Sequence, residues 1–165
     1  MTRAASFALH DFVAGHLSEL VDLWVGAWQR TMPAIDFEAR RAWFVDHLSA
    51  QQEQGAQIVC AFDSGTGEMA GFVTIEPESG HLNQLAVAVR YWGSPAAARL
   101  LEEARRRSPA QIWLEVNQDN PRAVRFYEKQ GFVREEESVN PNSGLKTWRY
   151  RWRADRPSRP ETAQG

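Results

Sequence analysis

The segment NPRAVRFYEKQGF carries a tyrosine within a short helix whose two ends are clearly marked. Asn120 is a good N-cap, Pro121 suits the first helical position, and Gly131 can take the left-handed conformation just past the last turn. Helical spacing puts Tyr127 on the same face as Ala123, four residues earlier. Two interpretations are open: Tyr127 packs as a core aromatic, or its phenol, which titrates near pH 10, takes part in proton transfer.

Glu76 and His81 are two further candidates for proton transfer, and they flank the turn residues PESG. His81 has a reference pKa near 6.5, which suits proton transfer near neutrality. Each is equally well explained as an exposed residue at the end of a strand. The histidines at positions 10, 16, 47 and 81 form no i, i+4 pair, and no carboxylate cluster with metal-site spacing accompanies them. No metal site is predicted.

The first half of the chain must position these groups through alternating strands and helices. In chain order, hydrophobic periodicity predicts a strand over 6–13, helices over 14–30 and 36–52, and strands over 56–62 and 69–76. Asp36 suits the N-cap of the second helix. The turn-forming residues DSGTGE separate the last two strands, which predicts an antiparallel hairpin.

The second half of the chain has a different order. It reads as a strand over 82–89, a helix over 95–107, a strand over 111–117, the helix that begins at Asn120, and a closing hairpin of 132–138 with 147–152. Two strands joined through a helix indicate a parallel, right-handed unit. The fold class is therefore α/β, with a mixed, mostly antiparallel sheet and a ligand cleft near the carboxyl ends of its parallel strands.

Bulk properties favour one domain over residues 1–153, followed by a polar, proline-rich tail over 154–165 that we expect to be disordered. Apolar residues make up 43% of the chain, and its net charge of −2 provides no field that attracts nucleic acid or an anionic membrane. The single cysteine, Cys60, excludes an internal disulfide. The chain has neither a signal-like apolar segment nor a run of about 18 apolar residues, so we expect a cytoplasmic protein.

Two segments resemble the GCN5-related N-acetyltransferase (GNAT) family. NPRAVRFYEKQGF resembles that family's N-x-x-A-x-x-F-Y-E-K-x-G-F, and LAVAVRYWGSPAAARLL, residues 85–101, resembles its cofactor motif L-x-V-x-P-E-x-R-G-x-G-x-G-x-x-L-L. Positions that agree with the second motif are Leu85, Val87, Gly93, Ala97, Leu100 and Leu101. Positions that depart from it are Val89, Arg90, Trp92 and Pro95, where the family usually has Pro, Glu, Arg or Gln, and Gly.

The resemblance implies the family's fold over about residues 5–153, with two parallel strands that splay apart and acetyl-CoA, the cosubstrate, in the gap. The cofactor-binding residues that it implies are Leu85, Ala86, Val87, Trp92, Gly93, Ser94, Ala96, Ala97, Asn120, Ala123 and Tyr127. Backbone N–H groups of Gly93, Ser94, Ala96 and Ala97 would face the pyrophosphate at a positive helix end. Pro95 has no N–H to offer, and SPAAARLL is also explained as a well-capped amphipathic helix.

The implied reaction is acetyl transfer to a primary amine of a small molecule or peptide, by direct attack of the amine on the thioester. On this basis Tyr127 is the general acid that protonates the departing thiolate. The backbone N–H near Val87 is the oxyanion donor. Glu76 and His81 are the candidate catalytic bases.

The acceptor pocket, by the same resemblance, is walled by the first two helices and their connection, with Trp28, Met32 and Asp36 as candidate substrate-binding residues. Packing and helix capping explain the same three residues. We expect a monomer or homodimer. The alternative function is a catalytically inactive CoA-sensing or protein-binding module, which the unusual Trp92 and Pro95 favour. A general acid at Tyr127 favours the enzyme.

Overall fold

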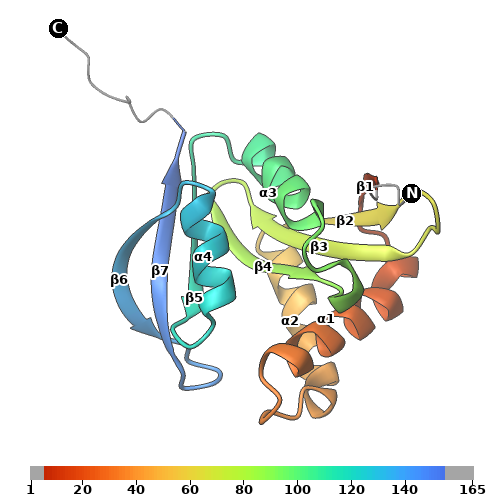
Figure 1. Ribbon diagram of the computed structural model, residues 1–165, viewed down its shortest axis with the longest axis horizontal. Helices are drawn as coiled ribbons and strands as arrows, with labels where there is room; N and C mark the ends of the chain where they lie inside the picture. The colour runs from red at the N-terminus through yellow and green to blue at the C-terminus, as the bar shows by residue number, and fades with distance from the viewer. Residues whose placement is uncertain (1–5, 155–165) are drawn as a thin grey trace, which may run out of the picture.

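The computed structural model describes residues 6–154, so residues 155–165 of the expected tail lie outside the described residues. Seven strands form one sheet in the order β1-β2-β3-β4-β5-β7-β6 (Figure 1). The strands are β1 Phe7–Asp11, β2 Gln57–Asp63, β3 Met69–Glu76, β4 His81–Val87, β5 Gln111–Asn117, β6 Val133–Val139 and β7 Lys146–Arg153. The α-helices are α1 Leu17–Thr31, α2 Arg41–Glu53, α3 Ala96–Arg107 and α4 Pro121–Lys129, and the short 3-10 helices are η1 Ala14–His16, η2 Glu38–Arg40 and η3 Val89–Tyr91.

The sheet separates two hydrophobic layers, because successive side chains along a strand point to opposite faces. Phe72 in β3 packs with the residues of α1 and α2. Its neighbour Val73 packs with the residues of α3 and with Tyr127 of α4. Both side chains are fully buried. Within residues 6–154, none of the helices combines the length and the apolar character needed to cross a bilayer.

The predicted hairpin of β2 with β3, the parallel order of β4 and β5, and the closing hairpin of β6 with β7 are all present. The parallel pair is held at one residue pair, His81 with Trp113, with the Trp113 N–H donating to the Gly80 carbonyl at 2.9 Å. Beyond this point β4 and β5 diverge. A mixed sheet with a gap between its two parallel strands is therefore the observed architecture.

A bulge in β4 determines which residues face that gap. Thr74 of β3 pairs with Gln84 and Ile75 pairs with Leu82, which leaves Asn83 without a partner in the register. The extra residue reverses the alternation of side chains. As a result Leu82 and Leu85, three residues apart, both contact the layer that contains α3 and α4.

The helix predicted over 36–52 is wrong at its start, where η2 precedes α2. Asp36 lies before η2, and its Oδ1 accepts a hydrogen bond from the Ala39 N–H at 3.2 Å. The turn before η2 is held by Gln29 of α1, whose amide donates to the Ile35 carbonyl at 2.7 Å and accepts from the Phe37 N–H at 3.0 Å. These hydrogen bonds with α1 order the turn. The hydrophobic periodicity of the sequence does not indicate them.

Candidate active site

The gap between β4 and β5 exposes backbone groups of β4. The Ala88 N–H donates to the Ala70 carbonyl of β3 at 2.8 Å, so the backbone groups of Ala88 and Ala86 face β3. By alternation, those of Leu85 and Val87 face the gap. The Val87 carbonyl accepts a hydrogen bond from Trp92 Nε1 at 2.8 Å. The Val87 N–H therefore lies where the sequence analysis placed an oxyanion donor.

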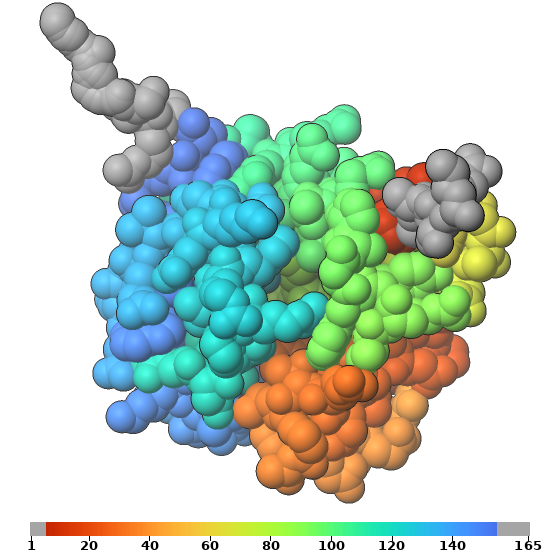
Figure 2. All heavy atoms as spheres, viewed as in Figure 1, coloured from red at the N-terminus to blue at the C-terminus, as the bar shows by residue number. Residues whose placement is uncertain are grey.

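A cavity of about 520 Å³ occupies this gap and extends along the β4–α3 segment and α4. Figure 2 shows the corresponding hollow between the surface of α4 and that of the β4–α3 segment. Every residue that the sequence analysis assigned to the cofactor lines this cavity except Ala96, whose side chain is fully buried. The charged residues that line it are Arg122, Arg125 and Lys129, and no carboxylate is among its lining residues in the described chain. The cavity therefore favours an anionic ligand.

The N–H groups at the start of α3 differ from the expected set. The Ser94 N–H donates to the Tyr91 carbonyl at 3.1 Å, and the Ala96 N–H donates to Ser94 Oγ at 3.2 Å, so both are already engaged. The N–H groups of Gly93, Ala97 and Ala98 have no partner among residues 6–154. Gly93 has a φ of 85°, a conformation that glycine adopts without strain. Three N–H groups can therefore meet a phosphate at this helix end.

A second cavity of about 200 Å³ lies on the other side of Tyr127. Its walls come from α1, α2, α4, β4, β5, β7 and the β6–β7 loop. Five residues line both cavities: Trp28, Leu85, Asn120, Ala123 and Tyr127. The two cavities therefore meet at Tyr127, at the open end of the parallel strand pair.

Tyr127 is held rigidly between aromatic neighbours. Its ring packs edge-on against Phe126 and Phe132, with centroids 5.1 and 5.4 Å away. The side chain is only 6% exposed, and burial raises the pKa of its phenol well above the ordinary value. The hydroxyl has no hydrogen-bond partner among residues 6–154. Tyr127 therefore keeps its proton at neutral pH, and it lines both cavities.

The two candidate bases lie in different environments. His81 lines the smaller cavity and stacks on Trp113 with centroids 4.1 Å apart. Burial lowers the pKa of its imidazole, so the ring is neutral at pH 7 and can accept a proton. Glu76 lines neither of the two cavities, and it accepts a hydrogen bond from Ser79 Oγ within the β3–β4 turn. Of the two, only His81 lines one of these cavities.

The expected acceptor wall is only partly in place. Trp28 lines both cavities, whereas Met32 and Asp36 line neither of them in the described chain. Met32 Sδ instead accepts a weak hydrogen bond from Asn117 Nδ2 at 3.5 Å, and Asp36 is exposed beside η2. Packing and capping, the second explanation considered for these residues, account for both.

Several lining residues were not identified from the sequence. Asn140 and Asn142 reach the smaller cavity from the β6–β7 loop. Thr147 lines it from β7 with only 2% of its surface exposed, and its hydroxyl has no partner among residues 6–154. Arg122 and Arg125, which line the larger cavity from α4, are also absent from the predicted site residues. Their spacing of three residues in a helix was the available signal that they share a face.

A comparison with known proteins supports this geometry. The yeast protein N-alpha-acetyltransferase 40 of Saccharomyces cerevisiae is 28% identical over 171 residues, covering 86% of this chain, and the chain spans 60% of that protein's length. A GCN5-related N-acetyltransferase structure from Rhodopseudomonas palustris superposes with a TM-score of 0.75 at 16% identity, covering 93% of this chain and 99% of that one. The PaiA N-acetyltransferase of Thermoplasma acidophilum, solved in complex with coenzyme A, gives a TM-score of 0.72 at 17% identity, with coverages of 89% and 99%.

The pattern of matching residues places the chain in a family. Residues 16–132 match the sequence profile of the Acetyltransferase (GNAT) family, and this range contains both cavity-lining motifs and Tyr127. The likeness in structure extends beyond the profile to the closing hairpin, because the superpositions cover about nine-tenths of the chain. The chain thus belongs to the acetyltransferase (GNAT) family.

Proposed function

We propose that this chain is an acetyl-CoA-dependent N-acetyltransferase that acetylates a primary amine of a small molecule or peptide. The observation that carries the proposal is the meeting of two unlike cavities at one protonated tyrosine. The larger cavity is cationic and offers unpaired backbone N–H groups. The smaller one is lined mainly by amide side chains, two histidines and apolar groups. A cofactor with several phosphates fits the first, and an uncharged amine fits the second.

The larger cavity has the features that acetyl-CoA requires. Gly93, Ala97 and Ala98 present free backbone N–H groups at the start of α3, where the helix dipole is positive. Small alanine side chains allow close approach of a diphosphate to the backbone. When bound, acetyl-CoA supplies an acetyl group activated as a thioester. The backbone of Leu85 and Val87, which faces the gap, is positioned to hydrogen-bond the amide-rich arm that leads to this thioester.

The residues at the junction divide the proton transfers between them. The neutral imidazole of His81 accepts, through water, the proton that the amine loses during direct attack. The Val87 N–H hydrogen-bonds the carbonyl oxygen as negative charge develops on it. Tyr127 Oη donates its proton to the departing sulfur, whose conjugate acid has an ordinary pKa near 8.5. Each group is in its required protonation state near neutral pH.

A peptide α-amine is the first acceptor to test. The similarity to a protein named N-alpha-acetyltransferase 40 supports this choice. The low negative charge of the smaller cavity also supports an acceptor with a single amine. Its carboxylate, Glu115, is already paired with Arg149 at 3.4 Å. A polyamine, which needs further carboxylates for its additional charges, fits this cavity less well.

The experiment is an acetyl-transfer assay with matched acceptors. The protein is incubated with acetyl-CoA and either a peptide with a free α-amine, the same peptide with that amine blocked and one lysine free, or a linear diamine. We expect stoichiometric release of thiol and addition of one acetyl group to at least one amine. Binding of CoA without transfer to any of these amines would instead favour a CoA-sensing module.

A further inference from the structure

We infer that Arg122 is a ligand of the cofactor diphosphate and that Trp92 is the residue that positions it. The inference rests on the proposed function, since it assigns a role within the cofactor cavity. Trp92 stands where the resemblance leads one to expect Arg or Gln. The positive charge missing from the β4–α3 segment is supplied across the cavity by α4.

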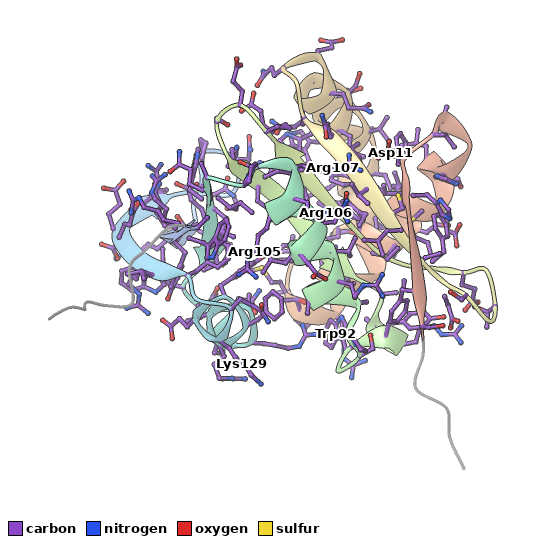
Figure 3. The ribbon with its side chains drawn as sticks, turned by 90° about the horizontal axis from the view of Figure 1, so that it is seen from above. Asp11, Trp92, Arg105, Arg106, Arg107 and Lys129 are labelled. Atoms are coloured by element: carbon purple, nitrogen blue, oxygen red, sulfur yellow. The ribbon has the colours of Figure 1, made fainter. Side chains whose placement is uncertain are left out.

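The contact between the two residues spans the cavity. Arg122 Cζ lies 3.8 Å from the centre of the Trp92 ring, which is the geometry of a cation stacked on an aromatic face. Both side chains line the larger cavity. Figure 3 labels Trp92 and shows its segment beside α4, on the side of the molecule that also carries Lys129. The pair therefore joins the two walls between which the cofactor must lie.

Trp92 is itself fixed, which makes it a suitable platform. Its indole N–H donates to the Val87 carbonyl at 2.8 Å, at the end of β4. A ring anchored to the strand holds the guanidinium within the cavity that Gly93 and Ala97 also line. The anchor and the stacked arginine are thus on the phosphate-binding side of the cavity.

Stacking leaves the hydrogen-bonding capacity of Arg122 unused. The guanidinium donates through N–H groups in its own plane, so a ring against its face blocks none of them. Among residues 6–154, no carboxylate lies within ion-pair distance of Arg122. Arg149 and Arg151, by contrast, pair with Glu115 and Glu135. An arginine whose planar guanidinium has no carboxylate partner, and which lines the same cavity as free helix N-terminal N–H groups, is suited to bidentate binding of phosphate oxygens.

The need for such a group follows from the backbone of the segment. Pro95 has no N–H, and those of Ser94 and Ala96 are engaged within the protein. Three backbone donors remain for a group that carries two phosphates. A guanidinium adds two aligned donors and a positive charge, and it compensates for the backbone donors that the segment lacks.

The inference is tested by calorimetric titration of the full chain with CoA, with 3′-dephospho-CoA and with pantetheine, which has no phosphate. In Arg122→Met, we expect the affinities for CoA and for dephospho-CoA to fall by the same factor, roughly 10- to 100-fold. The affinity for pantetheine should stay within about twofold of wild type, because no charged hydrogen bond is involved. Arg122→Lys, which keeps the charge but loses the fork, should fall in between.

Arg125→Met is the matched control, because Arg125 lines the same cavity from the same helix without stacking on the β4–α3 segment. It should weaken CoA binding less than Arg122→Met does, because no aromatic ring of residues 6–154 holds its guanidinium in place as Trp92 holds that of Arg122. Trp92→Leu should lower the preference for CoA over pantetheine by no more than Arg122→Met does, and the double variant should lose little more than Arg122→Met alone. Trp92→Phe, which retains a ring, should keep most of that preference.

Three outcomes would overturn the inference. Equal losses in Arg122→Met and Arg125→Met would show that only the general positive charge matters. A loss for CoA that disappears with dephospho-CoA would place Arg122 on the 3′-phosphate. A loss for pantetheine as large as that for CoA would reduce the pair to a structural contact. If the wild-type chain binds neither CoA nor dephospho-CoA, the proposed function itself fails, and the two failures are thereby distinguished.

Discussion

The two cavities that meet at Tyr127 are built by different means. The larger cavity is formed chiefly by consecutive residues of two segments, Leu85–Ala98 and Asn120–Lys129, and it uses backbone N–H groups and cations. The smaller cavity combines residues 81–85 of β4 and 114–117 of β5 with side chains from distant parts of the fold, among them His47 of α2, Asn142 of the β6–β7 loop and Thr147 of β7. A site made of local backbone geometry suits a constant cofactor. A site made of separate side chains can change one position at a time to suit a different acceptor.

Tyr127→Phe tests whether the junction acts in chemistry while leaving the larger cavity intact. We expect kcat to fall by about 10²- to 10³-fold, because the departing sulfur loses its proton donor. The dissociation constant of acetyl-CoA should stay within about twofold, since the hydroxyl makes no hydrogen bond within the described chain that would disturb the cavity. Steady-state kinetics and calorimetry measure the two quantities separately.

Tyr150→Phe is the control for this prediction. Tyr150 is also buried, but its hydroxyl donates to Glu128 at 2.7 Å, accepts from Arg134, and lines neither cavity. It should lower the free energy of unfolding by about 1 kcal/mol, with kcat nearly unchanged. An unchanged kcat in Tyr127→Phe would remove that residue from the mechanism.

The smaller cavity should impose its own pH dependence through His81. Burial is the main cause that lowers the pKa of His81, opposed by the charges of Glu115 and Glu76 and supported by those of Arg149 and His47. Because the base must be neutral, kcat at saturating acceptor should be constant around pH 7 and should fall as the pH drops through the lowered pKa, below about 6.5. A pH–rate profile with saturating cofactor and acceptor measures this limb.

His81→Gln should lower kcat/KM by about 10²-fold and should abolish the limb, while acetyl-CoA binding is retained. Glu76→Gln, whose side chain lies outside both cavities, should change kcat/KM by less than about threefold. A profile of unchanged shape in His81→Gln would assign the limb to another group or to the amine itself.

Thr147→Val gives the smallest expected effect and separates the two cavities most cleanly. Thr147 lines the smaller cavity, and its buried hydroxyl has no partner in the described chain, so we expect a bound acceptor to satisfy it. The variant should raise the acceptor KM by about 5- to 10-fold without changing the affinity for acetyl-CoA. The melting temperature should stay equal or rise, because an unsatisfied buried hydroxyl is removed. A changed cofactor affinity with an unchanged acceptor KM would contradict the division between the cavities.

The contrast between the cavities also explains what the sequence could predict. The start of α4 at Asn120 and Pro121 and the parallel β4–α3–β5 unit depend on neighbouring residues, and both were predicted correctly. The family motifs placed Leu85, Val87 and Gly93 beside one cavity for the same reason. These features are local, so the spacing of residues along the chain is sufficient to reveal them.

Features that depend on distant contacts were not predictable from spacing. Asp36 was assigned to an acceptor wall, but two hydrogen bonds of the Gln29 side chain hold the turn that contains Asp36 outside both cavities. Thr147 reaches the smaller cavity only through strand pairing with Asn117. Each case is decided by a partner that the local pattern does not specify.

The most direct test of the account is thermal unfolding of the wild-type chain with and without a large excess of acetyl-CoA, since it requires no acceptor. A ligand at about 100 times its dissociation constant adds roughly 2.7 kcal/mol to the free energy of unfolding, so the account predicts a clear rise in melting temperature. Pantetheine at the same concentration should give a much smaller rise, because it lacks the phosphates that the cationic wall favours. An unchanged melting temperature at millimolar acetyl-CoA would contradict the assignment of the larger cavity to the cofactor.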